Sequence, residues 1–323
     1  MVNYQVSLTT KIHAGKLSMA SGRSILVIEP EDYSKKEVEA IKAKGYTVLG
    51  YLSIGSVSDE RPYYGRLKPY RLKKLEDWPH EWYLDLRKAA AGKWCVERAG
   101  EIRKMGFDGL WLDNLDLYEE YRSPAMYAAI TSVLQSIRPI GGYVMINGGA
   151  AYISACISDS TAGAALYRVQ LGDYSLKEAK KKLAELKASG FAAILKKDGA
   201  MYRLQAGAYA RWENAKGMRE RLHAAGYTDA AVIKTGAGIR ELFDGVTQEE
   251  VFSLIKDYDA GKFAKQSASQ SGCYQRHLKR CREQGIETFL LEYTKSTSLA
   301  QKIKEFSTLC GMTGFYISQT VDM

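Results

Sequence analysis

The stretch that best indicates the fold is GFDGLWLDNLD, residues 106–116. It begins at Gly106, continues as an apolar run at residues 109–112, and ends in two acids, Asp113 and Asp116. A short apolar run of this kind is typical of a strand in a parallel sheet, because such strands are buried on both faces. The acids then follow the carboxyl end of the strand, which is where α/β barrels hold the residues that meet a substrate.

Further apolar runs alternate with amphipathic helical stretches on both sides of this segment. Strands are expected at residues 4–8, 24–28, 47–54, 109–112, 143–146, 243–246, 288–293 and 314–318. Helices are expected at residues 34–44, 93–105, 124–137, 272–284 and 298–309. Eight strands that alternate with helices predict the α/β class and a (β/α)8 TIM barrel. The run at residues 82–86 is expected to be an accessory strand in a long loop.

A repeated motif interrupts the barrel pattern. YRVQLGDY at residues 167–174 returns as YRLQAGAY at residues 202–209, and each copy leads into a helical run and a short apolar run. Two copies of strand–helix–strand predict a small ferredoxin-like βαββαβ domain. The predicted organisation is a first part of the barrel at residues 1–160, an insert at 165–237, and the remainder of the barrel at 240–323.

Charge also separates the insert from the rest of the chain. Residues 167–236 hold 14 Lys and Arg against 7 Asp and Glu, a net charge of +7. The whole chain has a net charge of +9, so the other 253 residues carry only +2. A basic block inside a nearly neutral protein is typical of a separate module.

Strand alternation predicts which side chains of the insert face a ligand. The apolar positions Val169, Leu171, Leu204 and Ala206 should meet the two helices. The alternate positions should line an uncovered face of the sheet: Arg168, Gln170, Arg203 and Gln205. Such side chains can hydrogen-bond the hydroxyls and amides of a glycan strand, or form a polar face that serves only as a spacer. An RNA-binding sheet would instead carry aromatic residues there, so no nucleic-acid partner is expected.

Composition bounds the remaining classes. With 46% hydrophobic and 26% charged residues the chain is globular, and no apolar run approaches the ~20 residues that a membrane span needs. The five cysteines are scattered, so no disulfides are expected, and the four histidines form no close-spaced pair, so no metal site is expected. The sequence has no phosphate-binding glycine loop, so no cofactor is expected. No signal peptide is visible. The expected location is extracellular or in the cell envelope if a signal has been removed, and cytoplasmic otherwise.

Acids follow strands on both sides of the insert, namely Asp113 and the pair Glu249 and Glu250 in DGVTQEEVF, residues 244–252. Two carboxyl groups across one barrel mouth are what glycoside cleavage needs, one as nucleophile or base and the other, with raised pKa, as acid. A separation of about 5–5.5 Å indicates a retaining enzyme and about 6.5–9.5 Å an inverting one. A much larger gap indicates sugar binding alone. Aromatic residues offer platforms for sugar rings at Tyr51, Tyr64, Trp82 and Trp111.

Each of these residues also has a structural interpretation. Asp113 and Asp116 alternatively cap the following helix or bind a structural cation. Glu249 and Glu250 alternatively form the exposed first turn of a helix. Trp111 and Tyr51 alternatively fill the barrel.

Two family resemblances follow from these motifs. The repeat at residues 167–236 resembles the SPOR domain, a module that binds peptidoglycan glycan strands stripped of their stem peptides. The flanking segments resemble glycoside hydrolase family 114, the endo-α-1,4-polygalactosaminidase group. That resemblance is carried by YLSIGSVSDERPYY (residues 51–64), WYLDLR (82–87), GFDGLWLDNLD (106–116), VMINGG (144–149) and DGVTQEEVF (244–252).

The resemblance implies a hydrolase that cleaves an α-linked amino-sugar polysaccharide of the galactosamine type and is targeted to cell-wall glycan by the insert. It places the nucleophile on Asp113 and the acid/base on Glu249. It also implies a substrate pocket built from Tyr51, Ser53, Arg61, Tyr64, Trp82, Trp111, Asn114, Asp116, Asn147, Glu250, Glu292 and Tyr293.

The chain departs from the family pattern at three places. It has Ser56 where many members have Glu, Gly149 where they have an acid, and Glu292 where they have Asp. The alternative is therefore a non-catalytic carbohydrate- or peptidoglycan-binding protein on a degenerate barrel.

Overall fold

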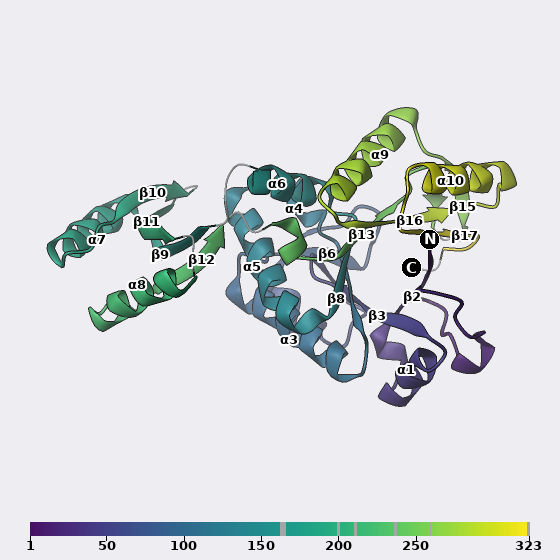
Figure 1. Ribbon diagram of the computed structural model, residues 1–323, viewed down its shortest axis with the longest axis horizontal. Coiled ribbons are helices and arrows are strands. Elements are labelled where there is room, and N and C mark those ends of the chain that lie inside the picture. Colours follow the sequence, from purple (N-terminus) through teal and green to yellow (C-terminus); the bar gives the residue numbers. More distant parts are fainter. Residues whose placement is uncertain (162–165, 199–200, 210–211, 236–237, 259, 322–323) are drawn as a thin grey trace. The chain divides into compact units, whose positions relative to one another are not determined.

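The computed structural model describes residues 1–161, 166–198, 201–209, 212–235, 238–258 and 260–321. Eight parallel strands form a closed barrel in the order β1-β17-β16-β13-β8-β7-β3-β2, which confirms the predicted (β/α)8 architecture (Figure 1). These strands are β1 (Val2–Ser7), β2 (Ser24–Ile28), β3 (Tyr46–Ser53), β7 (Gly109–Asp113), β8 (Tyr143–Asn147), β13 (Gly245–Glu249), β16 (Glu287–Tyr293) and β17 (Gly314–Ser318).

Helices cover the outside of the barrel and bury one face each. In α1 (Lys35–Lys42), Val38 and Ile41 are buried. The helix starts at a capping box, in which the Ser34 hydroxyl accepts from the Glu37 N–H and the Glu37 carboxylate accepts from the Ser34 N–H. The other helices outside the insert are α3 (Ala89–Lys104), α5 (Pro124–Gly141), α6 (Ala150–Thr161), α9 (Ala268–Glu283) and α10 (Thr297–Leu309). Shorter helical turns are α2 (Tyr64–Leu67), α4 (Leu117–Glu120), η1 (Ala14–Lys16), η2 (Pro30–Asp32), η3 (Lys68–Tyr70) and η4 (Ile239–Glu241).

The interior of the barrel is filled by large side chains that include a hydrogen-bonded set. Trp111 is fully buried, and its Nε1 donates to Tyr4 Oη at 3.0 Å and to Thr247 Oγ1 at 3.2 Å. The Tyr4 and Thr247 hydroxyls are 2.8 Å apart. Because these polar atoms satisfy one another, a polar residue can occupy the centre of a barrel strand without an unpaired group.

This arrangement explains why β13 extends further than expected. The apolar pattern ends at Val246, but the strand continues to Glu249 because Thr247 and Gln248 are both buried. Glu249 therefore occupies the carboxyl end of a barrel strand, and the segment after it leads into another strand. The alternative in which Glu249 and Glu250 begin a helix is wrong.

Two small sheets lie in the connections that follow barrel strands. The segment after β3 forms a three-stranded sheet in the order β4-β6-β5, from β4 (Ser56–Ser58), β5 (Arg71–Lys74) and β6 (Glu81–Leu84). β6 is the accessory strand expected near residue 82. The segment after β13 forms a hairpin of β14 (Ser253–Asp257) and β15 (Lys262–Lys265).

The insert has the predicted βαββαβ order. Its elements are β9 (Leu166–Tyr174), α7 (Leu176–Ala188), β10 (Ile194–Asp198), β11 (Met201–Tyr209), α8 (Trp212–Ala224) and β12 (Ala230–Thr235), and the sheet order is β10-β11-β9-β12. Both helices lie on one face of the sheet (Figure 1). Val169, Leu171, Leu204 and Ala206 are buried in a core with Leu186 of α7 and Leu222 of α8, as the strand alternation predicts.

The two copies of the repeat share a Gly-x-Tyr spacing, at residues 172–174 and 207–209, that the backbone conformation explains. Gly172 has φ 39°, and the β9–β11 pairing is irregular at this point. A Cβ on Gly172 would lie 2.3 Å from the ring of Tyr174, so the tyrosine packs directly over the glycine backbone. The second copy repeats this contact between Gly207 and Tyr209. Each G-x-Y therefore forms a local bulge that any side chain at the glycine would block.

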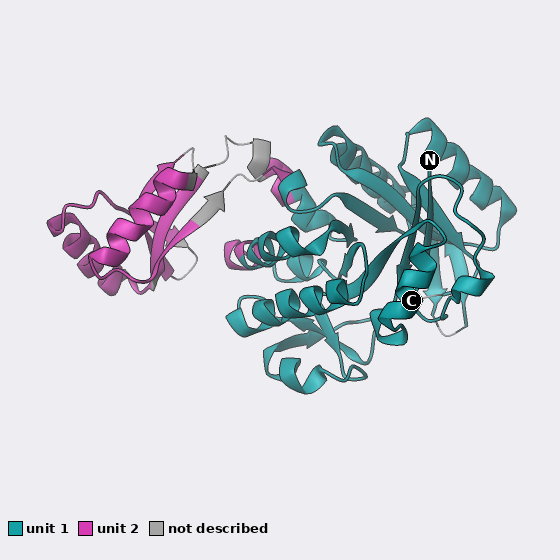
Figure 2. Ribbon diagram, turned by 60° about the horizontal axis from the view of Figure 1, so that its bottom comes forward, with its two compact units in different colours: residues 1–122, 129–154, 240–323 teal, residues 123–128, 155–239 magenta. Residues whose placement is uncertain are grey.

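The chain separates into two compact units (Figure 2). The first comprises Met1–Arg122, Ala129–Ser154 and Arg240–Met323, and the second comprises Ser123–Ala128 and Ala155–Ile239. Within the first unit β8 and β13 are hydrogen-bonded neighbours, with Met145 opposite Gly245. Within the second, the first and last strands of the insert pair with Leu166 opposite Thr235. The barrel strands that precede and follow the insert, β8 and β13, thus pair directly with each other.

Candidate active site

Asp113 lies half-buried at the carboxyl end of β7. Its Oδ2 accepts a hydrogen bond from Tyr51 Oη at 3.2 Å and from Asn114 Nδ2 at 3.3 Å, and its Oδ1 accepts one from Asn147 Nδ2 at 3.0 Å. Burial raises the pKa of Asp113, and the bonds from Asn147, Asn114 and Tyr51 oppose that rise because they stabilise the charged form. The carboxylate is thus oriented by three donors from three barrel strands or their ends.

Glu249 lies half-buried at the carboxyl end of β13. Its Oε1 accepts from Asn147 Nδ2 at 2.5 Å and its Oε2 from Tyr293 Oη at 2.9 Å. Burial, followed by the negative charge of Asp113, raises the pKa of Glu249 to about 8. At neutral pH this carboxyl group therefore holds a proton, as a general acid must.

Asn147, at the end of β8, joins the two acids. Its amide nitrogen donates to Asp113 Oδ1 at 3.0 Å and to Glu249 Oε1 at 2.5 Å. These two distances limit the separation of the two carboxyl oxygens to at most about 5.5 Å, their sum. Asn147 is only 6% exposed, and its Oδ1 has no hydrogen-bond partner. One buried amide therefore sets the spacing of the acids.

The backbone turns sharply directly after each acid. Among the described residues, Asn114 (φ 66°) and Glu250 (φ 55°) are the non-glycine residues with positive φ. This conformation is costly for residues with a Cβ, and it persists only where side-chain contacts hold it. Asn114 Nδ2 is held by Ser53 Oγ at 3.1 Å, and the Glu250 carboxylate accepts from the Ile255 N–H. These contacts therefore fix the direction in which the chain leaves each strand end.

A third carboxyl group, which the sequence did not single out, lies beside Asp113. Glu81, at the start of β6, accepts through Oε1 from the Ser56 hydroxyl and from Asn114 Nδ2 at 3.4 Å. Burial raises the pKa of Glu81, and the charge of Asp113 raises it further, whereas the bond from Ser56 and the charge of Arg61 lower it; the net shift is upward. The only sequence signal was its place directly before WYLDLR, because the β4–β6 pairing that brings it to Ser56 is not visible in local patterns.

Two predicted substrate contacts are corrected by burial. Trp111 is 0% exposed, so it fills the barrel and cannot offer a ring face to a sugar. Glu292 is also 0% exposed, and its carboxylate accepts from the backbone N–H of Phe252 and Ser253 and from the Ser253 hydroxyl. Glu292 therefore holds the segment after β13 in place beneath the mouth.

Four of the predicted pocket residues, Tyr51, Arg61, Tyr64 and Trp82, are half-buried and form a rim of polar and aromatic groups. Arg61 pairs with Glu29 at 2.7 Å, and its guanidinium lies over the Tyr51 ring at 5.7 Å. The rings of Tyr64 and Trp82 are 5.8 Å apart, and Arg71 lies over both.

Asp116 and Ser53 have local structural contacts. Asp116 is exposed and accepts from the Gly149 N–H at 3.2 Å, whereas its side chain makes no cap hydrogen bond to α4. Asp116 is the N-cap residue of α4, but its side chain does not cap the helix. Ser53 Oγ lies 2.6 Å from Ser56 Oγ, so it belongs to the network that holds Asn114 and Glu81.

The polar face of the insert carries the four predicted residues on neighbouring strands. Gln170 of β9 lies opposite Gln205 of β11, and Arg203 lies opposite Lys196 of β10. Gln205 is more buried than expected, at 9% exposure, and its Oε1 has no hydrogen-bond partner. The buried Nε of Arg168 also lacks one.

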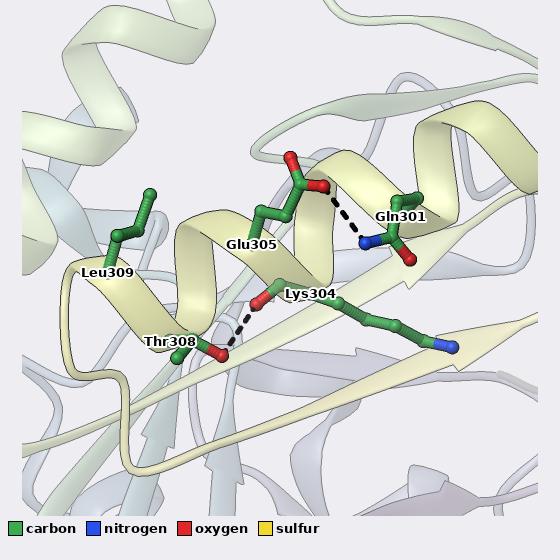
Figure 3. Close-up of a pocket in the computed structure, with 5 residues that line it drawn as sticks. All are labelled: Gln301, Lys304, Glu305, Thr308 and Leu309. Atoms are coloured by element: carbon green, nitrogen blue, oxygen red, sulfur yellow. Dashed lines mark hydrogen bonds between the residues drawn. The ribbon is translucent and has the colours of Figure 1, made fainter.

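Other features of the described chain do not compete with this site. No group of three or more His, Cys, Asp or Glu residues in the described ranges could hold a metal ion. A shallow depression on α10 (Figure 3) is lined by five exposed residues of that one helix, and Gln301 Nε2 donates to Glu305 Oε1 there at 2.9 Å. It contains a single carboxylate. None of the described helices has the length and apolar composition needed to cross a membrane.

Comparisons with known proteins match two segments of the chain. The model of glycoside-hydrolase family GH114 matches residues 2–147, and the model of the SPOR domain matches residues 163–234. No curated protein sequence matches the chain.

Two solved structures show the same fold. The glycoside hydrolase domain of PelA from Pseudomonas aeruginosa aligns with 16% identity and a TM-score of 0.62, covering 99% of this chain and 96% of that one. Ega3 from Aspergillus fumigatus, solved in complex with galactosamine, aligns with 12% identity and a TM-score of 0.55, covering 99% and 91%. The chain thus has a barrel that matches glycoside-hydrolase family GH114 over residues 2–147, and it carries a SPOR domain at residues 163–234.

Proposed function

We propose that the protein cleaves an α-linked galactosamine-type polysaccharide with retention of configuration, using Asp113 as nucleophile and Glu249 as acid/base. The observation that carries this proposal is the shared amide of Asn147, which holds oxygens of the two carboxyl groups within about 5.5 Å of each other. Retaining glycosidases need about 5–5.5 Å between their carboxyl groups, and inverting enzymes need room for a water molecule. A barrel that only bound sugar would need no such spacing.

The different surroundings of Asp113 and Glu249 give each residue its role in the two steps of the reaction. In the first step Asp113 attacks the anomeric carbon and forms a glycosyl ester, while Glu249 gives its proton to the departing glycosidic oxygen as the C–O bond breaks. In the second step a water molecule attacks the same carbon and releases Asp113. The Glu249 carboxylate takes the proton of that water, which restores the starting protonation state. The raised pKa of Glu249 suits the first step, and the three donors around Asp113 suit a charged nucleophile.

Two observations support the choice of polymer. Ega3, which shares the fold, has been solved with galactosamine bound. The mouth of this barrel also carries several carboxyl groups, which suit a sugar with a positive amino group.

The proposal is tested by the stereochemistry of the product. Incubation of the protein with α-1,4-linked galactosamine polymer should release new reducing ends, and NMR at early times should show the α-anomer first, since two displacements preserve configuration. A panel of neutral polysaccharides serves as the control. Initial release of the β-anomer would contradict the retaining mechanism, and no release from the amino polymer would contradict the substrate.

We further propose that the SPOR domain tethers the enzyme to peptidoglycan glycan strands in the cell envelope or outside the cell. The supporting observation is the polar sheet face, on which Gln170 and Gln205 pair and two buried polar atoms, Arg168 Nε and Gln205 Oε1, have no partner. Unpaired buried groups are costly, and a glycan that supplies hydroxyls and amides satisfies them.

Substitution of this face should abolish retention on the polymer. The full-length double variant Arg203→Ala, Gln205→Ala should pellet with denuded peptidoglycan at least about tenfold less than the wild type, because charged hydrogen bonds contribute about 1.5–3 kcal/mol each. Lys181→Ala on α7 removes the same charge away from this face and should pellet normally. Equal pelleting of all three proteins would reduce the insert to a spacer.

A further inference from the structure

The acids of the mouth have no cationic side chain as a partner. The chain has 46 Lys and Arg against 37 Asp and Glu, and surface carboxylates elsewhere form ion pairs with them. In the described part of the chain, no ion pair reaches Glu81, Asp113 or Glu249. Arg61, the guanidinium on this rim, is paired with Glu29, and its charge lowers the pKa of Glu81 by less than burial and Asp113 raise it. Carboxylates gathered without an ion-pair partner of their own repel one another, so a ligand that brings a positive charge gains binding energy there.

Glu81 is the acid whose contacts leave part of it available to a ligand. Both hydrogen bonds that it accepts, from the Ser56 hydroxyl and from Asn114 Nδ2, go to the same oxygen, Oε1. No described residue donates to Oε2, and the side chain is half-buried in the mouth. A carboxylate with one anchored oxygen and one vacant oxygen is suited to accept a hydrogen bond from a substrate.

The position of Glu81 relative to the nucleophile determines which part of a sugar it can reach. Asn114 Nδ2 lies 3.4 Å from Glu81 Oε1 and 3.3 Å from Asp113 Oδ2, so these two oxygens are at most about 6.7 Å apart, the sum of the distances. Asp113 must contact the anomeric carbon, C1. The substituent on C2 is attached to the next carbon of the ring, and it therefore lies within reach of a carboxylate at this distance from the nucleophile.

We propose that Glu81 is a specificity-determining residue that binds the C2 ammonium group of the sugar unit whose linkage is cleaved. This role rests on the proposed function and assigns to Glu81 the selection of an amino over an acetamido group at C2 of the cleaved unit. An N-acetyl group carries no charge to pair with Glu81 and is larger than an ammonium group. Discrimination against it is strong because an uncharged ligand leaves the carboxylate unpaired in a half-buried site.

The test compares the full-length wild type with Glu81→Gln on two forms of one α-1,4-galactosamine polymer, fully deacetylated and N-acetylated. Glutamine keeps an oxygen for Ser56 and Asn114 but removes the charge. The variant should lose about 10- to 100-fold in kcat/KM on the deacetylated polymer, the range expected for one charged hydrogen bond, and change less than about twofold on the acetylated polymer. Glu76→Gln, on the exposed part of the same connection, is the matched control and should keep the wild-type preference.

The outcomes separate the possible roles of Glu81. If Glu81 only supports the turn at Asn114, Glu81→Gln lowers both rates by the same factor, and the inference is wrong while the proposed function stands. Glu81→Asp keeps the charge on a shorter side chain and should retain part of the preference for the deacetylated polymer. If Glu81→Asp lost this preference while Glu81→Gln kept the wild-type ratio of kcat/KM on the two polymers, the inference would also be wrong. A wild type that cuts neither polymer contradicts the proposed function and this inference with it.

Discussion

Asp113→Asn should lower the rate of reducing-end release by about 10⁴-fold or more, because the variant lacks the nucleophile on which both chemical steps depend. Asparagine is isosteric with aspartate. Its side-chain oxygen can still accept from Asn147, and its amide nitrogen, in the place of Oδ2, can donate to the Tyr51 hydroxyl, which can turn to accept. The melting temperature should therefore stay near that of the wild type. The rate is measured as initial release of reducing ends from deacetylated polymer at several enzyme concentrations.

Asp108 provides the matched control for this variant. It belongs to the same segment, but it lies before β7, at the opposite end from the mouth, where Oδ2 accepts from the Val48 N–H at 2.9 Å and Oδ1 pairs with Lys42 at 2.7 Å. Asp108→Asn should lower stability modestly and leave kcat nearly unchanged. Loss of activity in both variants with equal loss of folded protein would show that Asp113 is structural, and a wild-type rate in Asp113→Asn would remove the catalytic assignment.

Glu249→Gln should change both the pH dependence of the rate and that of stability. The wild-type rate should fall as pH rises through about 8, the pKa of Glu249, because the general acid loses its proton there. It should also fall on the acid side as Asp113 becomes protonated. The variant should lose about 10²- to 10⁴-fold of the rate on polymer and show no alkaline decline of its own. An aryl glycoside whose leaving group needs no proton should still form the glycosyl ester.

The same pKa makes a prediction about stability. Glu249 has a folded pKa of about 8, above the value near 4.3 of an unfolded glutamate, so between these pH values the folded state binds more protons than the unfolded state. Stability of the wild type should therefore decrease from about pH 4 to pH 8, whereas Glu249→Gln escapes this loss. The melting temperature of the variant should exceed that of the wild type at pH 9 and match it at pH 4. Glu283→Gln, on the exposed end of α9, should show no such difference.

The sequence predicted the barrel and the insert because their elements are encoded in local patterns. Apolar runs of strand length identified all eight barrel strands, and the repeat identified both halves of the insert. The end of β13 was missed because Thr247 interrupts the apolar run, and its hydroxyl is satisfied by Tyr4 and Trp111 from distant strands. Such long-range hydrogen bonds leave no trace in local composition.

The same limit applies to the candidate site. The positions of Asp113 and Glu249 at strand ends predicted that both would lie at the mouth. In the structure one residue, Asn147, donates hydrogen bonds to both of them. The sequence could not predict that Trp111 and Glu292 are buried. Near a strand end, the local pattern is the same for a side chain that points to solvent and for one that points into the barrel. Glu81 depended on the register of a small antiparallel sheet, which is set by tertiary packing.

The direct pairing of β8 with β13 has a consequence for how the chain folds. The barrel can close only after the ribosome has delivered the whole insert, and a long unfolded segment between two partners costs loop-closure entropy, about 0.6 kcal/mol for each doubling of its length. The insert begins and ends on adjacent, hydrogen-bonded strands. Once the insert has folded, its first and last strands are neighbours, so the chain between β8 and β13 behaves as a short loop. The entropy cost of pairing β8 with β13 is then that of a short loop.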